Sequence, residues 1–89
     1  MTDETVESAR EAIDEVDRRL LEAVNRRIEL VRALHEHKVA NGIPLKDPGR
    51  EEALLARLRA VNPGPLSDDG LDRLYSFVLD LTRTEVHGG

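Results

Sequence analysis

The chain has 89 residues, of which 35% are charged and 39% hydrophobic, and its formal net charge at pH 7 is −5. This length has room for one domain, and the acidic balance argues against nucleic acid as a partner. Because the sequence contains no cysteine, it excludes disulfide bonds, thiolate metal sites and a catalytic thiol.

The sequence also argues against a membrane partner. No apolar run approaches the length of a membrane span, and the N-terminal residues lack the apolar core of a signal peptide. We therefore expect a cytoplasmic location. The aromatic residues are Tyr75 and Phe77 alone, which predicts a thin core and favours association with another chain.

A single long helix is predicted over residues 6–40, after a polar lead-in at residues 1–5. The segment has no glycine or proline, and its apolar residues recur mainly every three or four positions. They are Val6, Ala9, Ile13, Val16, Leu20, Val24, Val31 and Leu34. The helix would be roughly 50 Å long, whereas a globule of this size has a radius of gyration of about 12 Å. The helix therefore has to project, and we expect its apolar stripe to pack against a second copy.

Three cations interrupt this apolar stripe. At about 100° per residue, Arg27 and Lys38 fall in the middle of the apolar arc, and Arg10 lies at its edge. Each side chain could extend to solvent or pair with an acid on another helix, because an unpaired buried cation is costly. Taken together, three cations on one arc instead indicate a binding site for a small anionic ligand.

A second helix is predicted after a short connector. Asn41 and Gly42 are expected to end the first helix, and an extended stretch follows. Asp47 as N-cap and Pro48 at the first helical position then predict a helix over residues 48–60.

The apolar face of this second helix leaves two charged residues to explain. The face consists of Leu54, Leu55, Leu58 and Val61. Arg50 and Glu51 lie one turn before Leu54 and Leu55, so both could point toward the core side. They could equally be a surface arginine and an acid that favours the helix dipole.

A third helix is predicted over residues 68–86. Residues 62–65 contain two prolines and a glycine and form a loop, and Ser67 reads as the N-cap. The predicted buried face consists of Leu71, Leu74, Tyr75, Val78, Leu81 and Thr82. Glu85 and Val86 continue this face.

The candidate site combines cations, two carboxylates and one hydroxyl: Arg10, Arg27, Lys38, Arg50, Asp47, Glu51 and Thr82. Arginine binds carboxylates through a bidentate fork, so the set suits a small dicarboxylate with a hydroxyl. It would act by positioning and electrostatic stabilisation, without proton transfer. His35 and His37 cannot share a helix face and His87 is remote, so no metal site is expected.

The order and spacing of these residues resemble the all-helical chorismate mutases. The resemblance covers roughly residues 8–82 and rests on Arg10, Ile13, Asp17, Leu20, Leu21, Arg27, Lys38, Pro44, Asp47, Arg50 and Glu51. It implies an all-α fold in which chains of three helices form an intertwined homodimer with two identical active sites. The long first helix would be shared between the two sites.

The resemblance also implies a reaction, the Claisen rearrangement of chorismate to prephenate, with no cofactor and no covalent intermediate. Arg27 and Arg50 would bind substrate carboxylates within their own chain's site. Arg10 would reach into the partner's site. Lys38 would donate to the ether oxygen, where negative charge grows as the carbon–oxygen bond breaks.

The remaining site residues include one departure from the family. Asp47 and Glu51 would stand near the ring hydroxyl, with Glu51 accepting its hydrogen bond, and Thr82 matches a family serine that helps with a carboxylate. The family usually places glutamine four residues after that serine, as a second donor to the ether oxygen. Here Val86 occupies the position. We expect a protonated Glu85 to replace this donor if the last helical turn shifts.

Three other functions remain open from the sequence. A relative of the same fold could act on 4-amino-4-deoxychorismate, although Asp47 and Glu51 follow the chorismate pattern. A related pyruvate lyase would act on isochorismate. A non-catalytic helical dimerisation module would carry apolar residues in place of Arg27 and Lys38. The sequence does not distinguish primary from secondary metabolism.

Overall fold

The computed structural model describes residues 2–87, which form three helices: α1 (Thr2–Ala40), α2 (Arg50–Val61) and α3 (Asp68–His87). Residues 2–87 contain no strand, so the predicted all-α class with a long first helix is confirmed. None of the described helices is long and apolar enough to cross a membrane. The cytoplasmic location stays a prediction.

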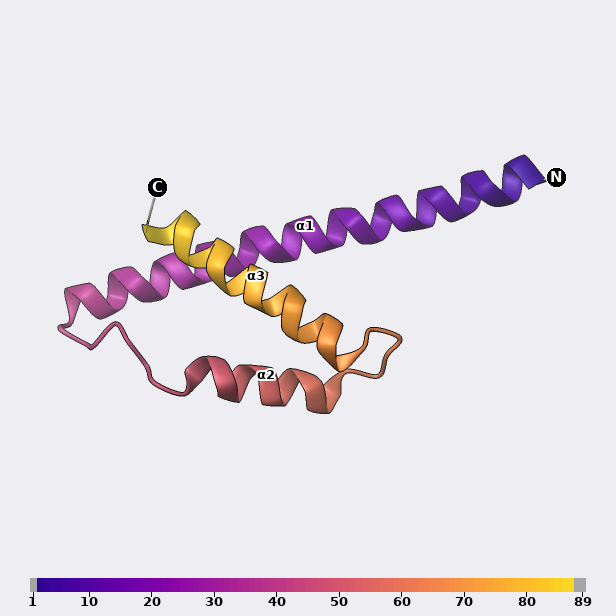
Figure 1. Cartoon of the computed structure of the whole chain (residues 1–89). Coiled ribbons are helices and arrows are strands. Elements are labelled where there is room, and N and C mark those ends of the chain that lie inside the picture. The colour runs from indigo at the N-terminus through magenta and orange to yellow at the C-terminus, as the bar shows by residue number, and fades with distance from the viewer. Residues whose placement is uncertain (1, 88–89) are drawn as a thin grey trace.

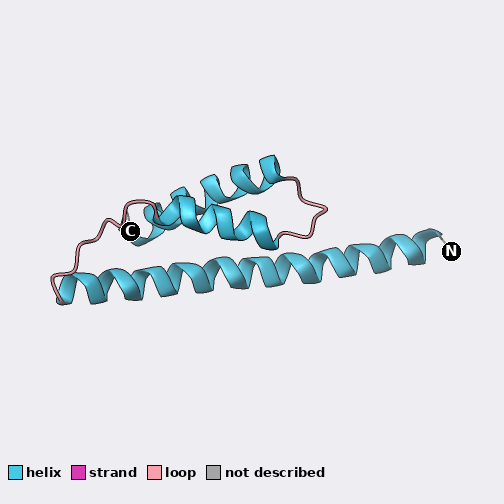
Figure 2. Cartoon of the chain, turned by 90° about the horizontal axis from the view of Figure 1, so that it is seen from below, coloured by secondary structure: helices cyan, strands magenta, loops and turns pink. Residues whose placement is uncertain are grey.

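The molecule is elongated because α1 extends well beyond the other two helices. Its dimensions are 61 × 27 × 18 Å and its radius of gyration is 17.1 Å, against about 12 Å for a globule of this length. α3 crosses the C-terminal half of α1 (Figure 1). In the perpendicular view, α2 and α3 lie together on one side of α1 and leave its N-terminal part uncovered (Figure 2).

α3 connects the other two helices. It contacts both α1 and α2, whereas the Cα atoms of α1 and α2 stay more than 8 Å apart throughout the described residues. Within residues 2–87, Leu71 on α3 is the one buried hydrophobic side chain, with 4% of its surface exposed. A single chain therefore buries very little apolar surface of its own.

The apolar stripe of α1 is largely exposed. Its members on the uncovered part are between 45% and 62% exposed, and they are Val6, Ile13, Val16, Leu20 and Leu21. Toward the C-terminal half, Val24, Ile28 and Val31 are half-buried against α3. The stripe therefore has two parts, one packed within the chain and one open.

The start of α1 differs from the prediction, whereas its end agrees with it. The predicted polar lead-in is wrong, because α1 begins at Thr2 and has Asp3 and Glu4 in its first turn, where carboxylates favour the helix dipole. The predicted end is confirmed: Gly42 has a φ of 65°. The Ile43 amide donates to the carbonyl of Lys38 at 2.9 Å, which is the long bond of a Schellman cap.

The start of α2 corrects the predicted cap. The N-cap is Gly49, with φ 83° and ψ −8° and no side-chain hydrogen bond, so the helix begins at Arg50. Asp47 instead accepts a hydrogen bond from the Arg50 amide through its backbone carbonyl, at 3.1 Å. Proline disfavours helical geometry in the residue before it. Pro48 and the left-handed Gly49 therefore belong to a turn that precedes the helix.

The predicted apolar face of α2 holds in part. Leu54, Leu55 and Leu58 are half-buried. Val61, the last residue of α2, is 73% exposed. Val61 is therefore not a core residue of the single chain.

α3 begins as predicted. The Gly70 amide donates to the Ser67 hydroxyl oxygen at 3.0 Å, which is the expected N-cap bond. Leu71 and Thr82 are buried, whereas Leu74, predicted on the same face, is 43% exposed. The half-buried members of the face are Tyr75, Val78 and Leu81.

Candidate active site

A cleft of about 880 Å³ opens between the three helices. Its walls are the C-terminal half of α1, the connector residues 45–49, the first turn of α2 and the C-terminal half of α3. Six of the predicted site residues line it: Arg27, Lys38, Asp47, Arg50, Glu51 and Thr82. The cleft therefore brings together residues that lie up to 55 positions apart in the sequence.

Three other predicted site residues do not line this cleft. Arg10 is exposed on the uncovered part of α1, 28 residues before Lys38 and so roughly 40 Å away along the helix. The Glu85 side chain is exposed, and its backbone carbonyl accepts a hydrogen bond from Arg32 Nη2 at 3.2 Å. Val86 is half-buried. The roles assigned to these three residues stay predictions.

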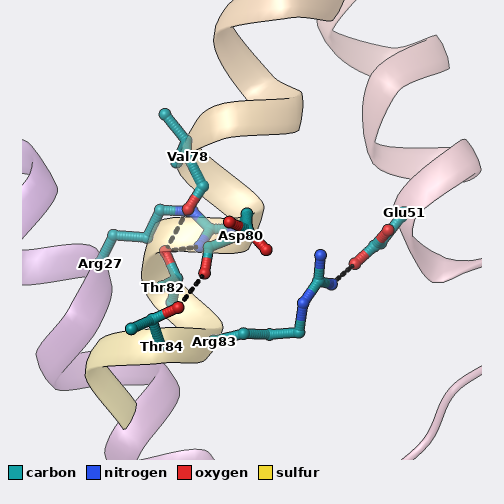
Figure 3. A network of polar contacts seen from close by, with 7 residues as sticks. All are labelled: Arg27, Glu51, Val78, Asp80, Thr82, Arg83 and Thr84. Carbon is teal, nitrogen blue, oxygen red and sulfur yellow. Dashed lines mark hydrogen bonds and ion pairs between the residues drawn. The ribbon is translucent and has the colours of Figure 1, made fainter. Parts of the chain in front are cut away.

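Arg27 is held in the cleft by a buried hydroxyl. Its Nη1 donates to Thr82 Oγ1 at 2.8 Å, and this hydroxyl donates in turn to the carbonyl of Val78 at 2.7 Å (Figure 3). Thr82 is 4% exposed and Arg27 is half-buried. The Thr82 hydroxyl donates its proton to the backbone carbonyl and accepts a hydrogen bond from the guanidinium. This second bond fixes one of the two terminal nitrogens of Arg27.

The three predicted cations of the cleft lack an acidic partner in the part of the chain that the structure describes. Within residues 2–87, Arg27, Lys38 and Arg50 form no ion pair. Lys38 is half-buried, whereas Arg50 is exposed at the start of α2. Because Arg27 and Lys38 lie on α1 and Arg50 on α2, these cations face the cleft from two walls. This arrangement suits a ligand with more than one anionic group.

Sequence reasoning missed two further cations that line the cleft, Lys46 and Arg83. Arg83 forms an ion pair with Glu51 between α3 and α2. Leu79, Arg83 and His87 are spaced four residues apart and all three line the cleft, but this spacing points to a site only once the packing of α3 is known. These three residues form a second line along α3, next to the buried face that was predicted for this helix.

The histidines are arranged differently from the prediction. His87 is not remote, because its ring contacts that of His35 edge to face, with centroids 4.5 Å apart. This contact joins the last turn of α3 to α1 beside the cleft. Among the described residues, no group of three histidine or acidic side chains is placed to hold a metal ion.

The chemistry of the cleft defines a class of protein. Five cationic and three acidic side chains line it, and the buried Thr82 adds a hydroxyl. Such a lining suits a small polyanion, whose charge fixed donors can stabilise. The described part of the chain is thus an all-helical protein with a cation-lined cleft, an arrangement suited to a small carboxylate ligand.

A comparison with known protein families identifies the family to which this chain belongs. The family described as chorismate mutase type II matches residues 9–86. The chain belongs to this chorismate mutase family, whose members are isomerases. The resemblance noted from the sequence is therefore confirmed.

Two similar proteins agree with this assignment. A structure of chorismate mutase (form II) from Thermus thermophilus has a TM-score of 0.79 and 32% identity, covering 86% of this chain and 88% of that chain. The bifunctional chorismate mutase/prephenate dehydratase of Neisseria gonorrhoeae (strain ATCC 700825 / FA 1090) is 35% identical over 77 residues. That match covers 86% of this chain and 21% of the relative, so the chain spans about a fifth of that protein's length.

Proposed function

We propose that the chain catalyses the Claisen rearrangement of chorismate to prephenate. The observation that carries the proposal is the set of Arg27, Lys38 and Arg50, three cations without an ion pair within residues 2–87 that line a cleft of about 880 Å³. A cleft of this volume accommodates a small dicarboxylate. Membership of the chorismate mutase family supports the same reaction.

The cations have separate roles in this mechanism. Arg27 and Arg50 bind the substrate carboxylates and hold the molecule in its reactive conformation. Lys38 donates to the ether oxygen, where negative charge develops as the carbon–oxygen bond breaks. A preorganised donor of this kind contributes about 10²–10³ in rate. The rearrangement is intramolecular, so this mechanism uses no cofactor and no covalent intermediate.

The other residues of the cleft orient the substrate and the Arg27 side chain. Glu51, on α2, accepts the hydrogen bond of the ring hydroxyl, and Asp47 lines the cleft from the connector that precedes α2. Thr82 keeps the Arg27 guanidinium in place through the 2.8 Å bond. Because that hydroxyl is buried, Arg27 has fewer rotamers available, and less conformational entropy is lost when substrate binds.

We further propose that two copies of the chain form an intertwined dimer. The exposed stripe of α1, with Ile13 at 58% and Leu20 at 55% exposure, gives the apolar surface for a partner. Arg10 and Lys38 lie roughly 40 Å apart on one unbroken helix, so an antiparallel second α1 would bring Arg10 of one chain to the cleft of the other. Sedimentation should give about twice the chain mass of 10.0 kDa. A folded monomer at micromolar concentration would refute the dimer.

The decisive experiment for the activity is a substrate panel. Purified protein is mixed separately with chorismate, 4-amino-4-deoxychorismate and isochorismate, and loss of the chorismate absorbance band is followed together with formation of prephenate. Lys38→Ala is the test variant, and Arg19→Ala is its control, because Arg19 also lies on α1 but is 76% exposed and does not line the cleft. Turnover of chorismate that is lost in Lys38→Ala and kept in Arg19→Ala supports the proposal. No turnover of chorismate by the wild-type chain would overturn it.

A further inference from the structure

Arg83 forms an ion pair that crosses the cleft. Its guanidinium, on α3, contacts a carboxylate oxygen of Glu51 on α2, and both residues line the cleft. Figure 3 shows the Arg83 side chain extended away from α3 toward Glu51, while Arg27 approaches Thr82 from α1. Among residues 2–87, this is the one ion pair between two lining residues.

The ion pair changes what Glu51 can bind. An ionised carboxylate has about four lone-pair positions, so a bond from Arg83 leaves positions free to accept a hydrogen bond from substrate. The charge of Glu51 is already matched by the guanidinium. A neutral hydroxyl can still donate to Glu51 without meeting repulsion. An ammonium group at the same place would be repelled by Arg83 and would gain less from a carboxylate that is already paired.

We propose that Arg83 determines specificity by acting through Glu51, so that the cleft selects a substrate with a neutral hydroxyl rather than an ammonium at the ring position facing Glu51. This inference rests on the proposed function. It concerns the contrast between chorismate and 4-amino-4-deoxychorismate, whose aliphatic amine is largely protonated at neutral pH. Arg83 is a positioning residue, because it acts on the substrate by way of the Glu51 carboxylate.

The expected size of the effect follows from the exposure of the pair. The side chains of Arg83 and Glu51 are 55% and 53% exposed, so solvent screens much of their interaction. Exposed ion pairs of this kind correspond to a change of about threefold to fivefold in an equilibrium or rate ratio. The effect should shrink as salt is raised, because screening weakens both the pairing and the repulsion.

The test compares the two substrates in four variants. The measured quantity is the ratio of kcat/KM for chorismate to kcat/KM for 4-amino-4-deoxychorismate. Arg83→Gln and Arg83→Met remove the charge, and Arg83→Lys keeps it. Arg59→Gln is the matched control, because Arg59 also joins α2 to α3 through Asp72 at 2.8 Å but does not line the cleft. Helicity measured by circular dichroism checks that each variant is folded.

We expect the ratio to fall about threefold to fivefold in Arg83→Gln and Arg83→Met, and to remain near wild type in Arg83→Lys and Arg59→Gln. A purely structural role of Arg83 would lower both kcat/KM values equally and leave the ratio unchanged, which overturns the inference. An equal rise in KM for both substrates would make Arg83 a general anion-binding group and overturn it as well.

The outcome also separates this inference from the proposed function. If the wild-type chain converts chorismate but the ratio does not move in Arg83→Gln or Arg83→Met, the inference fails and the function stands. If the wild-type chain converts neither compound, the function and the inference fail together.

Discussion

Thr82→Val tests how the buried hydroxyl supports Arg27. The substitution keeps the shape of the side chain and removes both of its hydrogen bonds, to Arg27 Nη1 at 2.8 Å and to the Val78 carbonyl at 2.7 Å. A hydrogen bond to a charged group contributes about 1.5–3 kcal/mol. Because Arg27 is half-buried, we expect the lower end, about 1.5 kcal/mol of unfolding free energy.

Thr84→Val provides a matched control on the same helix. The Thr84 hydroxyl donates to the carbonyl of Asp80 at 3.1 Å, which is the same bond to the preceding turn, and among the described residues it accepts no hydrogen bond from an arginine. The difference between the two variants therefore reports the Arg27–Thr82 bond together with the greater burial of Thr82, which is 4% exposed whereas Thr84 is exposed.

The assay is urea unfolding at one fixed protein concentration, together with steady-state kinetics on chorismate. Thr82→Val should lose about 1.5 kcal/mol more than Thr84→Val, and kcat/KM should fall about tenfold because the Arg27 fork is no longer held. Equal destabilisation in the two variants, with unchanged kcat/KM in Thr82→Val, would refute the reasoning.

The remaining predictions concern residues on α1 and the end of α3. Lys38→Ala should lower turnover about 10²–10³-fold without loss of folding, because it removes the donor to the ether oxygen; more than about a tenth of wild-type turnover would contradict this role. Mixing Arg10→Ala with Lys38→Ala subunits should restore activity by forming one intact site per heterodimer, and no recovery despite subunit exchange would contradict action in trans. The exposed position of the Glu85 side chain outside the cleft does not favour the donor role expected from the sequence, so Glu85→Ala should keep turnover within about twofold; a large loss of turnover would restore that role. If Lys38 is the sole donor, Val86→Gln should raise turnover.

The positions of the helices were largely predictable because local rules decide them. The glycine at the end of α1, the serine before α3 and the apolar spacing act over a few residues, and the structure agrees at Gly42 and Ser67. The start of α2 was not predicted, because Asp47 and Pro48 form a good start signal on their own. Gly49 adopts a left-handed φ of 83°, and a pattern of single residues does not show which of two neighbouring starts is used.

The candidate site was predictable only where a residue interrupted an apolar face. Arg27 and Lys38 stood out because they lie within the apolar arc of α1. Arg83 did not, because it lies outside the predicted buried face of α3 and its partner Glu51 is 32 positions away. Ion pairs between helices depend on how the helices pack, and the pattern of a single helix carries no information about that.

The sequence separation of the bonds that build the cleft has a consequence for the order of folding. Arg27 meets Thr82 across 55 residues, and Arg32 meets the carbonyl of Glu85 across 53. Helical turns form in about a microsecond or less from local contacts, whereas contacts of this separation must first close a long loop. During synthesis, α1 can become helical early, but the cleft is complete only after the last turns of α3 have been made. The chain therefore gains helical structure early in its synthesis and folding, and gains the capacity to bind a ligand only at a later stage.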